Sequence, residues 1–235
     1  MPDMSYPAAH GGMASGYLAV PSGDDGPWPG VVVIHEIFGL NADIRGKADQ
    51  LAARGYLALA PDLYGGRPWI RCVAGAIGQV RRGAGPAFDA LDGARAYLGA
   101  RQDCTGKTGV IGFCLGGGFA LLCAPRPGFD VAAVNYGDIP DDPTAALAGA
   151  CPVVASFGAR DKGIKAEKRG ELEQALAALE IPHDVKLYPD SGHRFMSQAS
   201  GAGAMVAKIA QMTYQPEDAA DAWDRIYAFF GQYLS

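Results

Sequence analysis

The sequence contains neither a long hydrophobic run nor a basic tract. Its longest apolar segments, such as Val31 to Ile34, are far shorter than the roughly 20 residues that a membrane-spanning helix needs. Lys and Arg number 20 and Asp and Glu 25, which gives a formal net charge of −5. No Lys/Arg cluster indicates binding to nucleic acid or to an anionic membrane surface. One or two local arginines could still bind a small anionic substrate.

The cysteines lack the spacing of a disulfide framework or a zinc knuckle. They stand at positions 72, 104, 114, 123 and 151, an odd number with no C-x-x-C pair. Residues 1–13 also lack the basic region and apolar core of a secretory signal peptide. We therefore expect reduced thiols and a cytoplasmic protein.

The 235 residues alternate between short apolar strands and amphipathic helices, which favours one α/β domain spanning residues 1–235. Predicted strands cover residues 31–34, 57–60, 107–112, 131–136, 153–157 and 184–188. Predicted helices cover residues 44–54, 86–99, 115–123, 165–179 and 217–233. Glycine-rich stretches at 65–66, 83–85 and 201–203 are expected to be loops. Such alternation predicts a mostly parallel central sheet with helices on both faces, in which ligands bind at the carboxyl ends of the strands.

The strongest local signal is the segment Gly112-Phe113-Cys114-Leu115-Gly116, where a predicted strand meets a predicted helix. A potential nucleophile with glycine two residues before and after it is the pattern of a nucleophile elbow, here with Cys where Ser is usual. Both glycines are needed because a Cβ would collide with neighbouring backbone in so sharp a turn. The helix N-terminus favours a thiolate at Cys114, and the Leu115 N–H would point at a developing oxyanion. Taken alone, the segment also fits a purely structural turn.

An acid and a histidine follow later strands in the order that an α/β-hydrolase requires. Asp161 follows the predicted strand 153–157, and His193 follows the predicted strand 184–188. In this arrangement the thiol attacks a carbonyl carbon, the imidazole moves the proton and the carboxylate fixes the imidazole tautomer. Three further acids also follow strands, namely Asp138, Asp141 and Asp190. They lie after the wrong strand or too close to His193 to replace Asp161.

The loop after the first predicted strand, His35-Glu36-Ile37-Phe38-Gly39-Leu40, supplies a fourth element. In this fold that loop gives the second oxyanion donor, here the N–H of Ile37. It also holds Glu36 where its carboxylate could reach the catalytic sulfur and accept a proton. The alternative for Glu36 is an ion pair with an arginine or a cap on the following helix.

These pieces together resemble the dienelactone hydrolase (carboxymethylenebutenolidase-like) family of α/β-hydrolases. The matching segments run in order along nearly the whole chain: His35 to Asn41, Pro61 to Tyr64, Gly112 to Gly117, Asp161, and Gly192 to Phe195. The resemblance implies a Cys114–His193–Asp161 triad, with Glu36 taking the thiol proton when substrate arrives. It further implies a thioester acyl-enzyme, a small unsaturated lactone carrying a carboxylate as substrate, no metal or organic cofactor, and a monomer.

The chain departs from that family where the substrate carboxylate is held. Dienelactone-cleaving members use arginines for this, one of them a few residues after the catalytic histidine, where this chain has Ser197 with Arg194 close by. The earlier arginine could be Arg81 or Arg82. Paired aromatics that family members often carry are replaced by Asn135-Tyr136. Our candidate substrate-binding residues are Phe38, Arg81, Tyr136 and Arg194.

Three functions are compatible with these residues. The leading one is a cysteine-dependent hydrolase whose partner is a small-molecule ester or lactone. The second is an enzyme of the same mechanism acting on another acyl substrate, such as an aryl ester or a thioester. The third is a catalytically silent scaffold used for binding, which is expected to have lost a triad member, whereas Cys114, His193 and Asp161 are all present.

Overall fold

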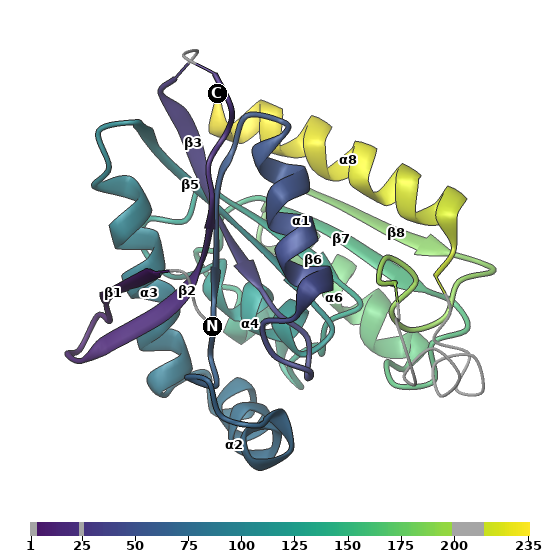
Figure 1. Cartoon of the computed structure of the whole chain (residues 1–235). Helices are drawn as coiled ribbons and strands as arrows, with labels where there is room; N and C mark the ends of the chain where they lie inside the picture. The colour runs from purple at the N-terminus through teal and green to yellow at the C-terminus, as the bar shows by residue number, and fades with distance from the viewer. Residues whose placement is uncertain (1–3, 24–25, 199–213) are drawn as a thin grey trace.

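The computed structural model describes residues 4–23, 26–198 and 214–235, which form one twisted sheet flanked by helices (Figure 1). Eight strands of this part of the chain lie in the order β1-β2-β4-β3-β5-β6-β7-β8. From β4 (Leu57–Pro61) to β8 (His183–Tyr188) all neighbouring strands are parallel. β1 (Met4–Pro7) and β2 (Met13–Ala19) form an antiparallel hairpin whose second strand pairs with β4.

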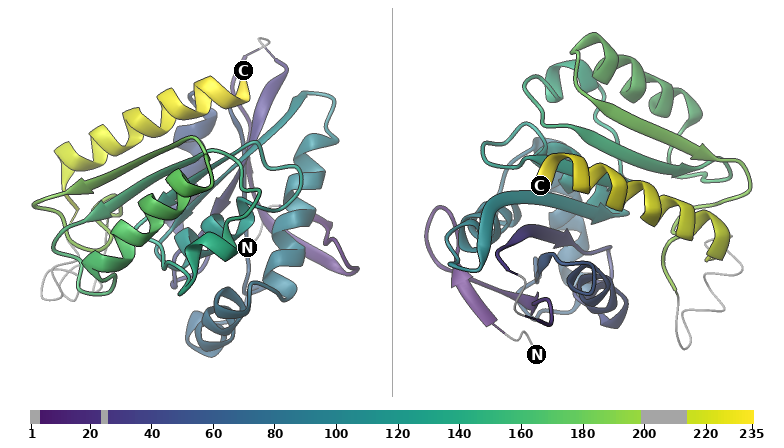
Figure 2. Two further views of the ribbon diagram at one scale, coloured as in Figure 1. Left: turned by 180° about the vertical axis from the view of Figure 1, so that it is seen from behind. Right: turned by 90° about the horizontal axis from the view of Figure 1, so that it is seen from above.

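Helices cover both faces of this sheet, as Figure 1 and Figure 2 show. One face carries α1 (Ala42–Ala52) and α8 (Pro216–Leu234), and the other carries α3 (Pro86–Gly99) and α4 (Leu115–Cys123). Close contacts at two glycines of the sheet show which helix packs on which face. A Cβ on Gly30 would lie 3.1 Å from Leu98 of α3, and one on Gly109 would lie 3.2 Å from Leu234 of α8. The predicted mostly parallel sheet with helices on both faces is confirmed.

The central strands are buried on both sides toward their carboxyl ends, which explains the apolar runs there. They are β3 (Trp28–Ile34), β5 (Cys104–Phe113), β6 (Val131–Asn135) and β7 (Val153–Gly158). The four residues Val31 to Ile34 have no exposed surface. Because these strands are parallel, their carboxyl ends meet at one edge of the sheet, and the loops after β3, β5, β7 and β8 lie there together.

The predicted helices 86–99 and 115–123 are confirmed with their predicted ends. Other elements shift by a few residues. α1 begins two residues earlier than predicted because the side-chain oxygen of Asn41 accepts a hydrogen bond from the Ile44 N–H at 3.1 Å and caps the helix. α6 (Ala166–Ala178) is one residue shorter at each end than its predicted range.

The sequence analysis missed the β1–β2 hairpin, the short α5 (Pro143–Ala146) and the longer α2 (Trp69–Arg82). α2 carries Gly75 and Gly78, which weaken helix propensity, and its N-cap Pro68 makes no side-chain cap. Glycine-rich loops are found at 65–66 and 83–85, as predicted, whereas 201–203 lies outside the described residues. Figure 1 shows α2 projecting below the body of the sheet.

All five cysteines are free thiols, and Cys123 is the one that is buried. No helix in the described part of the chain is both long and apolar enough to cross a membrane. Within residues 4–23, 26–198 and 214–235, no group of three or more His, Cys, Asp or Glu side chains is arranged to hold a metal ion.

The contact between α3 and the N-terminal hairpin generates a stability prediction. A Cβ on Gly93 would lie 2.3 Å from the Pro7 carbonyl oxygen and 2.9 Å from the Ala8 Cα, so the backbones would have to separate. We expect Gly93→Ala to lower the free energy of unfolding in urea by about 1–3 kcal/mol. The control Gly46→Ala, on α1 with nothing within 4 Å of the new Cβ, should raise it by about 0.5–1 kcal/mol. Equal stability of the two variants would contradict the close packing of α3 on β1.

Candidate active site

Cys114 occupies the sharp turn between β5 and α4. Its φ of 56° and ψ of −118° lie outside the regions that non-glycine residues favour. A Cβ on Gly112 would lie 1.9 Å from the Gly116 carbonyl oxygen, and one on Gly116 would lie 2.3 Å from the Ile34 carbonyl oxygen. The steric reason predicted for both glycines is therefore confirmed.

Cys114, His193 and Asp161, which follow three different strands, form a continuous chain of contacts. His193 Nε2 lies 3.1 Å from Cys114 Sγ, and His193 Nδ1 lies 2.7 Å from Asp161 Oδ2. The Gly163 N–H donates to Asp161 Oδ1 at 2.7 Å and fixes the carboxylate. The other three acids make different contacts: Asp138 with the N–H of Ile139, Asp141 with Lys168, and Asp190 with Arg160. Asp161 is therefore the acid that contacts His193.

Hydrogen bonding determines the charge of this constellation. Burial lowers the pKa of His193, but the hydrogen bonds with Asp161 and Cys114 outweigh it and raise this pKa to about 10. Burial raises the pKa of Asp161, and the contacts with His193 reverse that effect and lower it overall. At neutral pH an imidazolium thus lies between a carboxylate and the sulfur. The N-terminus of α4 adds positive partial charge beside Cys114.

Ile37 and Leu115 line the same cavity as Cys114. No loop or turn carbonyl of the described residues accepts a hydrogen bond from the N–H of either residue. The Ile37 peptide is fixed by Tyr64, whose hydroxyl donates to the Ile37 carbonyl at 3.0 Å. The sequence analysis missed this contact, although Tyr64 belongs to one of the segments on which the family resemblance rests.

His35 holds the same loop from its buried side. The Leu63 N–H donates to His35 Nε2 at 3.2 Å, and His35 Nδ1 lies 2.6 Å from the Glu36 carbonyl oxygen. These contacts require the neutral ring with its proton on Nδ1, and burial lowers the pKa of His35 accordingly. The ring also packs edge-on against Tyr64 with centroids 4.7 Å apart. His35 therefore orders the loop and does not face the cavity.

Glu36 is fully buried and is bound by two residues that follow His193 in the chain. Arg194 donates to Glu36 Oε2 from Nε at 2.7 Å and from Nη2 at 2.6 Å, and Ser197 donates to Oε1 at 2.7 Å. In this conformation Glu36 therefore forms the ion pair with an arginine that the sequence analysis gave as the alternative to contact with the sulfur. Among the described residues Glu36 makes no hydrogen bond with Cys114, so direct proton transfer between them would require the Glu36 side chain to move.

Ser197 connects this ion pair to a wider buried network. The Tyr136 hydroxyl lies 2.9 Å from Ser197 Oγ, and Lys47 Nζ donates to the same oxygen at 3.3 Å. Lys47 is itself paired with Asp43, one turn away on α1. The ring of Tyr136 packs edge-on against the ring of His193, with centroids 5.3 Å apart. The network therefore couples the position of Glu36 to one wall of the catalytic site.

A cavity of about 370 Å³ opens over Cys114. Of the predicted substrate-binding residues, Arg81 and Tyr136 line it, whereas Phe38 and Arg194 do not. Arg194 has a positive φ of 65° that directs it to Glu36, and its guanidinium lies 4.9 Å from the centre of the Phe38 ring. Ile77 lines the cavity from α2, which the sequence analysis had not assigned.

The profile of the dienelactone hydrolase family matches residues 14–234. The chain belongs to the dienelactone hydrolase family. A candidate carboxymethylenebutenolidase of Azospirillum brasilense is 32% identical over 246 residues and covers the whole of both chains. One of Yersinia pestis is 29% identical over 232 residues, which are 92% of this chain and 83% of the relative.

The crystal structure of a candidate dienelactone hydrolase from Klebsiella pneumoniae matches with a TM-score of 0.80 at 27% identity, over 98% of this chain and 99% of that chain. The predicted family, the α/β-hydrolase fold and the class of carboxylic ester hydrolase are thereby confirmed.

The charge of His193 generates a pH prediction. Its pKa is about 10 in the folded protein against 6.5 in an unperturbed chain, so its stabilisation is complete below pH 6.5 and is lost as the pH rises toward 10. By scanning calorimetry, the melting temperature of wild type should fall further over this pH range than that of His193→Gln. The surface variant His10→Gln should follow wild type. Equal losses in wild type and His193→Gln would show that the imidazolium is not favoured by folding.

Proposed function

We propose that this protein hydrolyses a small lactone or carboxylic ester through a thioester on Cys114. The observation that carries the proposal is the chain of contacts from Cys114 Sγ to His193 and from His193 to Asp161, at 3.1 and 2.7 Å. The position of Cys114 on a cavity of about 370 Å³ gives a small acyl compound access to the sulfur. Similarity to the candidate carboxymethylenebutenolidases supports the same chemistry.

In the first half-reaction the Cys114 thiolate attacks the carbonyl carbon, and the π electron pair moves onto the carbonyl oxygen. The N–H groups of Ile37 and Leu115 stabilise this oxyanion. When the tetrahedral adduct collapses, the bond to the leaving oxygen breaks and His193 Nε2 gives that oxygen its proton. A lactone stays whole as one acyl chain at this stage, because its leaving oxygen belongs to the acyl group.

In the second half-reaction the neutral His193 removes a proton from water as the water oxygen attacks the thioester carbonyl. The carbon–sulfur bond then breaks, which releases the carboxylic acid and restores the thiolate and the imidazolium. Asp161 keeps the Nδ1–H of His193 directed at its own carboxylate throughout, so that Nε2 faces the reacting atoms.

Glu36 is proposed as a second proton acceptor that acts when it is released from Arg194. Arg194 does not line the cavity in this conformation, so the role requires a substrate carboxylate to draw its guanidinium away from Glu36. The freed carboxylate of Glu36 could then approach Cys114 and take the proton of any neutral thiol. This role links activation of the sulfur to a substrate that carries a carboxylate.

The nucleophile is tested with Cys114→Ala, using 4-nitrophenyl acetate and a dienelactone as substrates. Loss of the sulfur removes covalent catalysis, so we expect kcat for both substrates to fall by about a thousandfold or more. Cys104→Ala, which removes a thiol at the opposite end of β5, should retain wild-type rates. Cleavage of the simple ester alone would keep the mechanism and exclude the dienelactone. Undiminished hydrolysis by Cys114→Ala would refute the proposal.

The role of Glu36 is tested with Glu36→Gln and the matched variant Arg194→Gln, which breaks the same ion pair but keeps the carboxylate. We expect Glu36→Gln to lower kcat for a carboxylate-bearing lactone by roughly tenfold or more and to change the pH profile of Cys114 alkylation by iodoacetamide. Circular dichroism checks that both variants fold, because an unpaired buried charge is costly. If Glu36→Gln changes neither the rate nor the alkylation profile, Glu36 is no proton acceptor.

A further inference from the structure

Asn135, the last residue of β6, lies beside the turn that carries Cys114. Its side chain is buried, and its Nδ2 donates a hydrogen bond to the Gly112 carbonyl at 3.2 Å. Its own carbonyl accepts a hydrogen bond from the Cys114 N–H at 3.0 Å. One residue of β6 therefore holds the chain both at Cys114 and two residues before it.

These two contacts act on a strained part of the backbone. The dihedral angles of Cys114 lie outside the regions that non-glycine residues favour, and such a conformation persists only where neighbouring groups hold it. Tyr136, directly after Asn135, also has a positive φ, of 42°, and its N–H donates to the Ser156 carbonyl at 2.8 Å. The turn is thus held by the end of β6, which is itself anchored on β7.

A buried amide is an unfavourable choice for packing at this position. Asn135 is in register with Phe113 of β5 and Ser156 of β7, and the Phe113 ring contacts Trp223 of α8, so the amide lies on the sheet face that α8 covers. Within the described residues Asn135 Oδ1 accepts no hydrogen bond, and a buried acceptor without a partner destabilises a fold. An apolar side chain would avoid that penalty. The contact that distinguishes the amide from such a side chain is its N–H on the Gly112 carbonyl.

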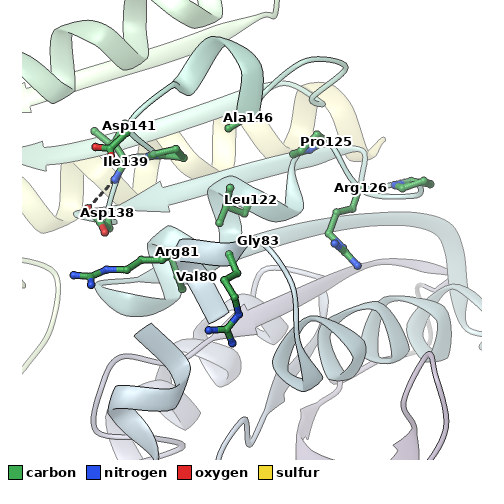
Figure 3. Close-up of a pocket in the computed structure, with 13 residues that line it drawn as sticks. Val80, Arg81, Gly83, Leu122, Pro125, Arg126, Asp138, Ile139, Asp141 and Ala146 are labelled. Carbon is green, nitrogen blue, oxygen red and sulfur yellow. Dashed lines mark hydrogen bonds between the residues drawn. The ribbon is translucent and has the colours of Figure 1, made fainter. Parts of the chain in front are cut away.

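The residues after Asn135 line the cavities near the site, whereas Asn135 itself does not. Tyr136 lines the space over Cys114, and Asp138 lines both that space and the larger cavity of about 1010 Å³ in Figure 3. Asn135 lines neither space. A substrate in either one therefore does not contact its amide, and an effect of Asn135 on catalysis has to act through the position of Cys114.

We infer that Asn135 is a positioning residue for the nucleophile. Its amide N–H holds the Gly112 peptide and thereby keeps Cys114 in the strained turn that places Sγ 3.1 Å from His193 Nε2. Without the amide the turn relaxes and the sulfur moves, and a misplacement of about 1 Å can cost a hundredfold in rate. The inference rests on the proposed hydrolase function. It gives a role to a residue that the sequence analysis recorded only as a departure from the family.

Two variants that remove the amide test the inference. Asn135→Leu keeps the shape of the side chain, and Asn135→Ala adds no bulk. In both we expect the release of 4-nitrophenol from 4-nitrophenyl acetate in a single turnover, with enzyme in excess, to slow by roughly tenfold or more. A displaced sulfur also loses the imidazolium beside it. The alkylation of Cys114 by iodoacetamide, followed on the Cys114 peptide by mass spectrometry, should therefore slow most near neutral pH, so that its pH profile moves to higher pH.

Ser156→Ala is the matched control. Ser156 is the buried polar residue in register with Asn135 on β7, and its hydroxyl accepts a hydrogen bond from Arg225 of α8 at 3.1 Å. We expect this variant to lower the melting temperature by about 2–4 °C and to keep the wild-type turnover and alkylation profile. Asn135→Leu should show the opposite pattern, with a melting temperature within about 2 °C of wild type and a sulfur that reacts slowly.

Wild-type turnover and alkylation in either variant, once circular dichroism shows that it is folded, would overturn the inference. Slow turnover with an unchanged alkylation profile would do the same, because the sulfur would then still be in place. Failure of both variants to fold would also overturn it, since the amide would then be essential to the sheet itself. Alkylation does not require hydrolysis. A shifted profile in the variants, without Cys114-dependent hydrolysis by wild type, therefore keeps the positioning role and refutes the reaction alone.

Discussion

The close approach of α4 to the end of β3 is the constraint on which the catalytic site depends. Because Gly116 has no side chain, its backbone lies against the carbonyl oxygens of Ile34 and His35. This contact places the loop that continues to Ile37 beside the first turn of α4. The thiol of Cys114 and the two N–H groups proposed to stabilise an oxyanion are thus positioned by one backbone packing contact. A single Cβ at Gly116 would separate them.

Behind this contact, charges that water cannot reach are compensated in pairs. Glu36 has no exposed surface and is bound by Arg194, while Lys47 is compensated by Asp43. Burial of an unpaired charge would cost several kcal/mol, so these pairs fix the loop residues in one arrangement. His193 differs because its imidazolium lies at the cavity, where the sulfur is one of its two partners. Pairing of buried charges therefore fixes Glu36 and Lys47 in place, whereas at His193 it keeps a reactive sulfur beside the cavity.

The parts of the fold and the candidate site that the sequence predicts are those that leave a local mark. The elbow around Cys114 shows as two glycines at fixed spacing, and buried strands show as β-branched runs. Contacts between distant segments leave no such mark, and for that reason the Tyr64 hydroxyl on the Ile37 carbonyl was missed. Arg194 was expected at the substrate, but its positive φ turns it toward Glu36, and a backbone angle of that kind in a non-glycine residue cannot be read from composition.

α2 shows why chemistry and substrate choice can vary independently in this fold. The groups that act on the carbonyl stand at the ends of strands held by the core on both faces. α2 has only Ala76 and Val80 as buried residues, yet Ile77, Val80 and Arg81 of this helix line the cavity over Cys114. Substitutions on its exposed face therefore change the shape and charge of that cavity at little cost in core packing. The element that the core constrains least is thus the one best placed to determine which ester reaches Cys114.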